Sequence, residues 1–383
     1  MTKIMLSVGE ASGDLHGASL AKALKAMQPD ISLIGMGGSG MRAAGVDIVY
    51  DIADLGVMGI VEVVRNLRKM FRLRDLLTEV MERERPDVLV VIDYPGFNMR
   101  LAAVAKRLGI PVVSYISPSV WAWGRGRAKG VAETVTKVAA IFSFEAEVYK
   151  EAGADVTFVG HPLLDIVKPQ WSKEEAIRHF GVNPAYPVVL LLPGSRRHEI
   201  DRLLTPMLEA AVRISEAIPG CQFFLPVAST ISREAIQTKL QSYPVDVQLT
   251  DGYTYDLMNI ADLALAASGT VTLEAALLQV PSVVIYKTAF LTYLIGKALV
   301  RIDNISLPNI VAGRRILPEF LQSAVTADNL VAAALPMLQD PAVRAKNKAD
   351  LAEVRHRLGE PGAVNRVARL VLDVAAESRG GRA

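Results

Sequence analysis

Residues 4–17 read Ile-Met-Leu-Ser-Val-Gly-Glu-Ala-Ser-Gly-Asp-Leu-His-Gly. This stretch begins with an apolar run of strand length and passes into a polar, glycine-rich turn that leads to a segment of helical period. The same alternation recurs along the chain, which predicts βα units around parallel sheets. The strand runs are continuously apolar rather than alternating, so we expect helices on both faces of each sheet.

The alternation falls into two series of predicted strands. The first series lies at residues 4–8, 31–35, 47–50, 88–92, 112–116, 138–142 and 156–159. The second lies at residues 188–192, 223–227, 247–249, 263–266 and 282–286. The sequence therefore predicts an α/β protein of two doubly wound domains that face each other across a cleft.

A polar stretch punctuated by prolines separates the two series and predicts a linker over residues 166–187. The predicted domains are residues 1–165 and 188–340. From about residue 327 the pattern is helical, and residues 341–383 are predicted to form C-terminal helices that pack back on the N-terminal domain.

Composition excludes several classes of protein. The chain has 383 residues, of which 51% are hydrophobic and 21% charged, so it is neither disordered nor collagen-like. A net charge of +2 gives no reason to expect nucleic acid as a partner. Cys221 is the single cysteine, which excludes an intrachain disulfide and indicates a reducing compartment. With no signal-peptide pattern and no apolar stretch of spanning length, we expect a cytoplasmic protein, and attachment to a membrane surface stays open.

In doubly wound sheets, ligands bind beyond the carboxyl ends of the strands, so the loops that follow strands carry the candidate functional residues. The loop Gly35-Met-Gly-Gly-Ser-Gly40 matches the G-x-G-x-x-G pattern of dinucleotide-binding proteins. It follows the second strand rather than the first, and no acidic residue ends a strand about 20 residues further on. A tight turn is therefore the favoured interpretation over nicotinamide binding.

The loop after the first strand combines two carboxylates, a hydroxyl and an imidazole. Ser12 or Asp14 is a natural N-cap for the following helix. Capping does not account for Glu10 and His16, which we expect to face a ligand. The fourth strand ends at Asp93, whose carboxylate could accept a proton from a substrate hydroxyl; the alternative is that it caps the following turn.

Trp121 and Trp123 lie beside Arg125 and Arg127 in the loop after the fifth strand. Tryptophans beside basic residues suit a sugar face or an acyl chain with phosphate nearby. Anchoring in the core is an equal alternative.

Two loops of the second series place glycine and hydroxyl residues at the start of a helix, where main-chain amides can hold phosphate. The candidate residues are Gly194, Ser195 and Arg196 in one loop and Ser268, Gly269 and Thr270 in the other. Glu274, one turn beyond Thr270, could reach ribose hydroxyls; the alternative is a capping box. Two such loops favour a nucleotide, and because the chain has no Asp-x-Asp pair and no metal-ligand spacing among its histidines, we expect no protein-held metal.

Residues 59–77 have apolar residues at helical spacing on one face and basic residues on another. The basic residues are Arg65, Arg68, Lys69 and Arg72. Such a helix can lie in the interface of an anionic membrane. The alternative is a crossover helix with a solvated basic face.

Seven strings occur in one order along the chain: Gly9-Glu-Ala-Ser-Gly-Asp14, Leu55-Gly-Val-Met-Gly-Ile-Val-Glu-Val63, Ile92-Asp-Tyr-Pro-Gly-Phe-Asn98, Ser117-Pro-Ser-Val-Trp-Ala-Trp123, Leu192-Pro-Gly-Ser-Arg196, Ala267-Ser-Gly-Thr270 and Ser306-Leu-Pro-Asn309. In these strings the chain resembles the lipid-A-disaccharide synthase family. The resemblance implies two Rossmann-like domains in the GT-B arrangement and an inverting glycosyltransferase without a cofactor. The reaction it implies joins UDP-2,3-diacylglucosamine to 2,3-diacylglucosamine 1-phosphate (lipid X), giving a β-1,6-linked disaccharide 1-phosphate and UDP at the cytoplasmic face of the inner membrane.

The resemblance also implies roles for residues that match the family's motifs. Asp93 would be the essential aspartate and candidate general base, with His16 and Glu10 as alternatives. Arg196, Glu274 and Asn309 would belong to the nucleotide site. Gly96 stands where relatives carry a second aspartate, which leaves Asp93 as the better candidate.

The remaining expectations concern the acceptor and the partners. Ser12, Asp14, the two tryptophans and the basic residues of 59–77 are assigned to the acceptor and membrane side, and a homodimer is an open expectation. Rival functions are a UDP-sugar epimerase of similar fold, a non-catalytic nucleotide-sugar-binding protein of the membrane surface, and an NAD enzyme.

Overall fold

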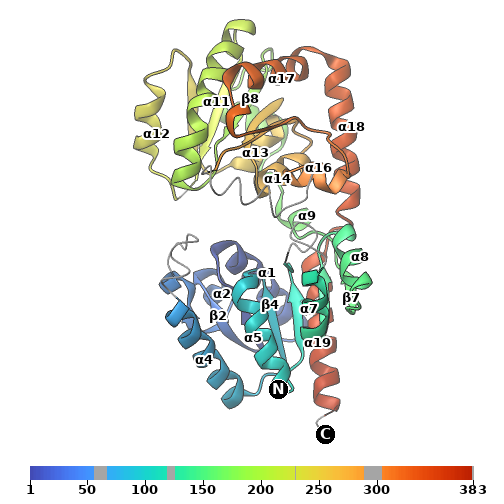
Figure 1. The fold of residues 1–383 in the computed structure, drawn as a ribbon. Coiled ribbons are helices and arrows are strands. Elements are labelled where there is room, and N and C mark those ends of the chain that lie inside the picture. The colour runs from blue at the N-terminus through green and yellow to red at the C-terminus, as the bar shows by residue number, and fades with distance from the viewer. Residues whose placement is uncertain (56–66, 119–125, 229, 289–303, 382–383) are drawn as a thin grey trace. The chain divides into compact units, whose positions relative to one another are not determined.

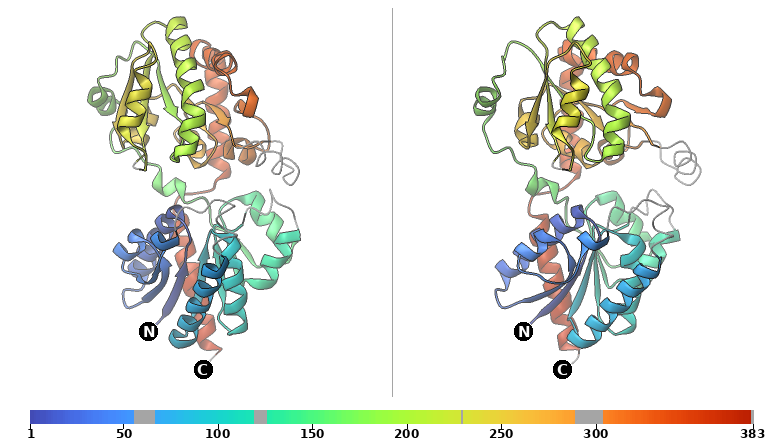
Figure 2. Two further views of the ribbon diagram at one scale, coloured as in Figure 1. Left: turned by 60° about the vertical axis from the view of Figure 1, so that its left-hand side comes forward. Right: turned by 90° about the vertical axis from the view of Figure 1, so that its left-hand side faces the viewer.

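The computed structural model describes residues 1–55, 67–118, 126–228, 230–288 and 304–381 (Figure 1). Its contacts divide the chain into two compact units: Met1–Asp165 with Gly359–Ala383, and Ile166–Leu358. Each unit has one parallel β-sheet with helices on both faces, as Figure 2 shows. The predicted α/β class with two parallel sheets is confirmed.

The sheet of the first unit has seven strands in the order β3-β2-β1-β4-β5-β6-β7, and every neighbouring pair is parallel. The strands are β1 (Lys3–Ser7), β2 (Ser32–Gly37), β3 (Asp47–Asp51), β4 (Val88–Ile92), β5 (Val112–Tyr115), β6 (Lys137–Ala140) and β7 (Val156–Phe158). All seven were predicted from their apolar runs. β4 is buried along its whole length, because helices cover both faces of the sheet.

The helices of the first unit are α1 (Ala11–Met27), α2 (Ser39–Ala43), η1 (Ile52–Leu55), α4 (Leu67–Glu84), α5 (Pro95–Arg107), α7 (Gly126–Thr134), α8 (Ser143–Glu151), α9 (Leu163–Ile166, which crosses the boundary) and α19 (Ala363–Gly380). α4 shows why such segments are helical. Leu73, Leu77, Val80 and Met81 recur at helical spacing, and all four are buried against the core, whereas Arg72 is exposed.

The sheet of the second unit has six parallel strands in the order β10-β9-β8-β11-β12-β13. The strands are β8 (Val188–Leu192), β9 (Gln222–Val227), β10 (Val247–Asp251), β11 (Leu263–Ala267), β12 (Ser282–Tyr286) and β13 (Glu319–Leu321). Five of them were predicted. β13 was not, because three residues that begin with a glutamate do not form an apolar run.

The helices of the second unit are α10 (Lys173–Phe180), α11 (Arg197–Ala217), α12 (Arg233–Leu240), α13 (Thr254–Ile260), α14 (Thr270–Leu277), α16 (Leu307–Ala312), η2 (Gln322–Ala324), α17 (Ala327–Gln339) and α18 (Pro341–Arg357). The predicted linker contains α10, whose N-terminus is closed by a capping box of Ser172 and Glu175. That helix packs against α13 within the second unit.

The last two helices belong to different units. The prediction that residues 341–383 pack on the N-terminal domain therefore holds for α19 and is wrong for α18. α18 packs against α14 and α16 of the second unit, and α19 packs against α1, β4 and β5 of the first. Each helix buries apolar side chains in the core of its own unit: Leu351 and Val354 in α18, and Val367 and Val371 in α19.

In each sheet the order of the strands reverses at one point. In the first unit this point lies between β1 and β4, and in the second between β8 and β11. The loops at the carboxyl ends of these strands diverge to opposite faces, which leaves room for a ligand between them.

Candidate active site

Most of the predicted catalytic and nucleotide-binding residues follow the four strands that flank the two reversal points. In the first unit, Glu10 and His16 follow β1 and Asp93 follows β4. In the second unit, Gly194–Arg196 follow β8 and Ser268–Thr270 follow β11. This is the position at which doubly wound sheets bind ligands.

The two loops of the first unit contact each other. A Cβ atom on Gly9 would lie 2.1 Å from Cδ1 of Tyr94, so only glycine lets the Tyr94 ring pack there. Tyr94 and Asp93 both have a left-handed backbone, with φ of +50° and +51°. Non-glycine residues in that region are strained, and such strain gathers at functional sites.

Asn98 holds this strained turn. Its Nδ2 donates to the carbonyl oxygens of Asp93 (2.8 Å), Ser7 (3.1 Å) and Ile92 (3.2 Å), and its Oδ1 accepts from the Ser7 hydroxyl (2.7 Å). Asn98 is 1% exposed, so these bonds are shielded from water. The side chain therefore joins the end of β1 to the turn that presents Asp93.

The environment of the Asp93 carboxyl suits proton transfer. Burial raises its pKa, and a hydrogen bond from the Tyr94 N–H opposes that shift. Its own N–H donates to the carbonyl oxygens of Tyr115 (3.3 Å) and Ile116 (3.2 Å), which ties the residue to β5. The turn-capping alternative holds in part, since the carboxyl accepts from the next residue. Capping does not explain a carboxylate made more basic by burial.

Asp14 faces the glycine-rich loop and not a free site. Its carboxylate accepts from the main-chain N–H groups of Gly38 (2.7 Å), Gly40 (2.8 Å) and Met41 (3.1 Å). Asp14 therefore caps α2, whereas the N-cap of its own helix is Glu10, which makes no side-chain capping bond. Since a carboxylate already fills the anion position of the G-x-G-x-x-G turn, the tight-turn interpretation is correct for that loop.

Burial lowers the pKa of the His16 imidazole. Its ring meets Tyr115 edge-on, with centroids 6.4 Å apart, and in the described part of the chain its buried Nδ1 has no hydrogen-bond partner. The pKa of His161 is lowered to about 3 by burial and by His16. Glu10 and Ser12, in the same loop, are exposed.

Several predicted acceptor-side residues lie outside the described residues: Trp121, Trp123 and Arg65. The described segment before the tryptophans is fixed by two hydrogen bonds. Ser114 and Ser117 share one between their hydroxyls (2.8 Å), and the Tyr149 hydroxyl donates to the carbonyl oxygen of Pro118 (2.7 Å).

The first turns of α4 carry the rest of the predicted basic face. Arg68 and Arg72 are exposed and Lys69 is half-buried. Phe71, between them, is 45% exposed, with the Arg74 guanidinium 5.2 Å from its ring centroid. An exposed aromatic among basic side chains is typical of helices that bind a lipid surface.

In the second unit, the loop after β8 is closed by a residue that the sequence analysis missed. Glu199 accepts from the N–H groups of Ser195 (3.0 Å) and Arg196 (3.1 Å), and its other oxygen pairs with Arg196 Nη1 (3.1 Å). Gly194 has φ of +110°, and a Cβ there would lie 2.3 Å from Glu199 Oε2. The amides that were assigned to phosphate are thus engaged, and the group this loop offers is the exposed Arg196 guanidinium.

The loop after β11 differs, because the start of α14 carries no side-chain cap. Gly269 is the N-cap residue, and a Cβ built on it meets nothing within 4 Å. The capping-box alternative for Glu274 is wrong: its carboxylate instead accepts from the Tyr255 hydroxyl at 3.4 Å, and burial raises its pKa. Among the described residues, no side chain therefore caps the first amides of α14, and an uncapped helix start can bind an anion.

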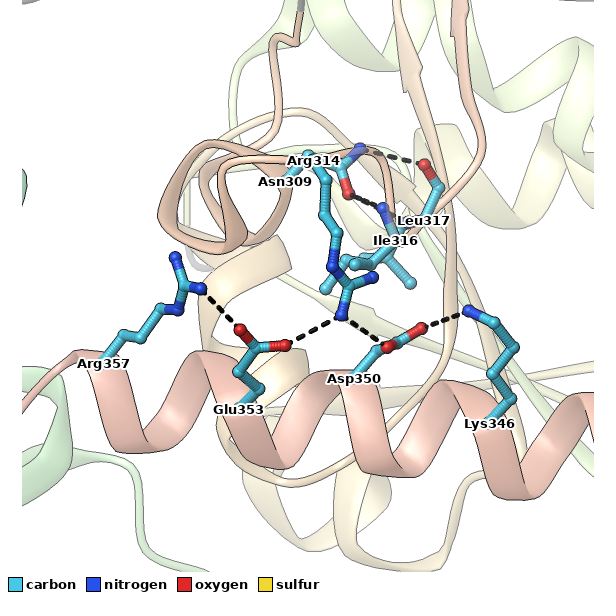
Figure 3. Close-up of polar contacts among 8 residues, drawn as sticks. All are labelled: Asn309, Arg314, Ile316, Leu317, Lys346, Asp350, Glu353 and Arg357. Carbon is cyan, nitrogen blue, oxygen red and sulfur yellow. Dashed lines mark hydrogen bonds and ion pairs between the residues drawn. The ribbon is translucent and has the colours of Figure 1, made fainter.

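Asn309 lies behind these loops with both ends of its amide engaged (Figure 3). Its Oδ1 accepts from the N–H groups of Ile316 (2.8 Å) and Leu317 (2.9 Å). Its Nδ2 donates to the Leu317 carbonyl (2.9 Å) and to Glu319 (2.7 Å). Two donors and two acceptor positions are all that a side-chain amide has, so Asn309 shapes the loop from within.

The same loop is tied to α18 by ion pairs (Figure 3). Arg314 Nη2 contacts Asp350 and Glu353, both at 2.8 Å. Lys346 pairs with Asp350 (2.7 Å), and Arg357 pairs with Glu353 (2.6 Å). The loop is thus held by buried hydrogen bonds on one side and by partly exposed charges on the other.

Known proteins resemble this chain in sequence along almost its whole length. The family model described as lipid-A-disaccharide synthetase matches residues 4–374. The lipid-A-disaccharide synthase of Geobacter sulfurreducens is 45% identical over 372 residues, 97% of each chain.

Two solved structures share the fold at low identity. The UDP-GlcNAc 2-epimerase of Neisseria meningitidis, bound to UDP-GlcNAc, has a TM-score of 0.66 at 14% identity and covers 97% of this chain and 100% of its own. MurG of Acinetobacter baumannii has a TM-score of 0.62 at 16% identity, with the same coverage. Epimerases and glycosyltransferases share this fold, so the likeness shows the fold and does not choose between their reactions.

Proposed function

The chain belongs to the lipid-A-disaccharide synthetase family and is a glycosyltransferase of lipid A biosynthesis. On this premise we propose which residues perform each part of the sugar transfer. The family match does not favour the epimerase, the NAD enzyme or the non-catalytic protein. We propose UDP-2,3-diacylglucosamine as the donor and lipid X as the acceptor. The products are the β-1,6-linked disaccharide 1-phosphate and UDP.

The second unit binds UDP in this proposal. The observation that carries it is the uncapped start of α14 at the sheet's reversal point, with the exposed guanidinium of Arg196 in the loop after the neighbouring strand β8. Helix amides and a guanidinium both stabilise the negative charge that grows on a departing diphosphate. In this proposal Glu274, whose carboxylate accepts from the Tyr255 hydroxyl, also accepts from ribose hydroxyls.

The first unit binds the acceptor, and Asp93 is the general base. Its carboxylate takes the proton of the acceptor 6-hydroxyl while that oxygen bonds to the anomeric carbon of the donor. The bond from the anomeric carbon to the β-phosphate oxygen breaks in the same step, and UDP leaves with the electron pair. Attack from the face opposite to UDP inverts the anomeric configuration, so an α-linked product would contradict this mechanism.

The acceptor is a lipid, and we propose that the protein meets it at the cytoplasmic face of the inner membrane. Support comes from Arg68, Lys69 and Arg72 around the exposed Phe71 on α4. In the described ranges, no helix has the length and hydropathy needed to cross a bilayer. Ser12, Trp121 and Trp123 are proposed acceptor contacts, and a homodimer stays a prediction.

Release of UDP from UDP-2,3-diacylglucosamine, measured with and without lipid X, tests the reaction. The expected result is release that requires lipid X and is largely lost in Asp93→Asn, although this variant still binds UDP. Retained activity in the variant would move the base to His16 or Glu10. Donor turnover without lipid X would contradict the transferase assignment.

A further inference from the structure

A buried carboxylate lies behind the nucleotide loops of the second unit. Glu319, the first residue of β13, is 7% exposed. It accepts from the N–H of Ile305 (2.9 Å), the N–H and hydroxyl of Ser306 (2.9 and 2.6 Å) and Nδ2 of Asn309 (2.7 Å). One side chain thus holds both ends of Ser306-Leu-Pro-Asn309, which is the N-cap and first turn of α16. Only a carboxylate offers acceptors on both of its oxygens.

The turn that Glu319 holds reaches the uncapped helix start. The Ser268 hydroxyl donates to the carbonyl oxygen of Ile305 at 3.2 Å, and its N–H donates to Ile285 at 2.8 Å. Ser268 directly precedes Gly269, the N-cap of α14. A continuous path of hydrogen bonds therefore runs from Glu319 through the Ile305 peptide to the residue that begins this loop.

We propose that Glu319 is a positioning residue of the nucleotide site. It fixes the Ile305 carbonyl, which orients Ser268 and keeps the first amides of α14 uncapped and directed at the diphosphate. Asn309 acts with it, because its amide is hydrogen-bonded to Glu319 and to the backbone of residues 316–317 and has no donor left for a ligand. This inference rests on the proposed binding of UDP to the second unit.

The test is calorimetric titration of the full chain with UDP, comparing wild type with Glu319→Gln. Glutamine keeps the shape but replaces one acceptor oxygen by a donor that faces other donors. We expect UDP to bind at least about tenfold more weakly, while KM for lipid X stays within twofold of the wild-type value. An unchanged affinity for UDP in a folded Glu319→Gln variant would overturn the inference.

A matched control separates positioning from general loss of stability. Asp262 also accepts a main-chain N–H with its carboxylate, that of Val188 at 3.0 Å, but at the amino-terminal edge of the same sheet. Asp262→Asn should lower the melting temperature and leave UDP affinity within twofold of wild type. Equal losses of affinity in Asp262→Asn and Glu319→Gln would show that Glu319 has only a structural role.

Two further variants test the path itself. Ser306→Ala removes a single donor to Glu319 and leaves the carboxylate, so it should weaken UDP binding about threefold even if Glu319→Gln does not fold. If Glu319 acts through Ser268, the double variant Glu319→Gln/Ser268→Ala should bind UDP no more weakly than Glu319→Gln alone. If the losses of UDP affinity in Glu319→Gln and Ser268→Ala instead multiply in the double variant, the two residues act independently and the path is contradicted. Failure of the wild type to bind UDP would instead refute the proposed function.

Discussion

The Asn98 side-chain amide donates to the main-chain carbonyl of Asp93 at 2.8 Å, and Asp93 has a left-handed backbone with φ of +51°. The carboxylate that we propose as the general base is thus set by a backbone conformation that is uncommon for aspartate. A buried hydrogen bond from a residue five positions later compensates for the strain.

We predict that Asn98→Ala lowers kcat about 10- to 100-fold, because the turn relaxes and moves the Asp93 carboxylate away from the position that proton transfer requires. UDP affinity should be unchanged, since the second unit is untouched. Measuring kcat together with the dissociation constant of UDP checks both statements.

Ser7→Ala is the matched control for this variant. It removes the one bond that Asn98 accepts and leaves the bonds that it donates to the carbonyls of the turn. The fall in kcat should be clearly smaller than in Asn98→Ala. An equal fall in kcat in both variants would mean that packing around Asn98, and not its hydrogen bond to the Asp93 carbonyl, sets the rate.

The pH profile of kcat/KM should report Asp93. Burial raises the pKa of its carboxyl, and a general base acts only when deprotonated. Activity should therefore fall as pH decreases through a pKa above the usual value of about 4 for aspartate. Asp93→Asn should lose about 10²- to 10⁴-fold in rate and also lose this acidic limb. An acidic limb that survives in the variant would assign it to another group.

Arg196 should contribute to UDP affinity through its guanidinium. Arg196→Gln removes a charged hydrogen-bond donor, which is worth about 1.5–3 kcal/mol, so the dissociation constant of UDP should rise about 10- to 100-fold. Arg197→Gln is the control, because Arg197 is exposed and adjacent but lies within α11. Equal losses in both variants would indicate only a general effect of charge.

Binding to anionic membranes should depend on the basic turns of α4. Replacing Arg68, Lys69 and Arg72 by glutamine should reduce sedimentation with phosphatidylglycerol vesicles, because each basic residue near such a surface contributes about 1 kcal/mol. Phe71→Ala should reduce binding further at high salt, where burial of apolar surface dominates.

A control for this experiment removes the same charge elsewhere. It uses three exposed basic residues of the second unit, Lys173, Arg178 and Lys348. Replacing them by glutamine should leave sedimentation near that of the wild type. A similar loss in both triple variants would attribute binding to net charge and not to α4.

Two fully buried tyrosines of the first unit should respond differently to loss of the hydroxyl. Tyr149 donates to the Pro118 carbonyl at 2.7 Å, whereas the buried Tyr115 hydroxyl has no partner in the described part of the chain. Tyr149→Phe should cost about 1–2 kcal/mol of unfolding free energy, and Tyr115→Phe should cost nothing or stabilise. Urea denaturation of both variants measures the difference. A loss in Tyr115→Phe would reveal a bond to this hydroxyl.

Most of the fold could be predicted from the sequence, because the apolar runs that form β1–β12 are local signals. β13 had none: it pairs with β12 through three residues, and its glutamate is buried only because Ile305, Ser306 and Asn309 donate to it. Such a burial depends on partners that no local pattern reveals.

The candidate site divides in the same way. The loops after β1, β4, β8 and β11 could be found from their polar residues alone. That Asp14 caps α2, or that Asn98 reaches Ser7 across 91 residues, depends on tertiary packing. Glu199 is different, because a carboxylate at the third helical position is a local capping signal that the sequence already contained.

The division of the last two helices between the units sets an order for folding during translation. α19 packs on α1, β4 and β5, and Arg379 near its end donates to Thr2 at 3.0 Å. Residues 166–358 leave the ribosome before α19 does, so the second unit can complete its core while the first still lacks a helix over its central strands. The domain that is synthesised first is thus the one that is finished last, and a nascent chain stalled before residue 359 would expose the apolar face that α19 covers.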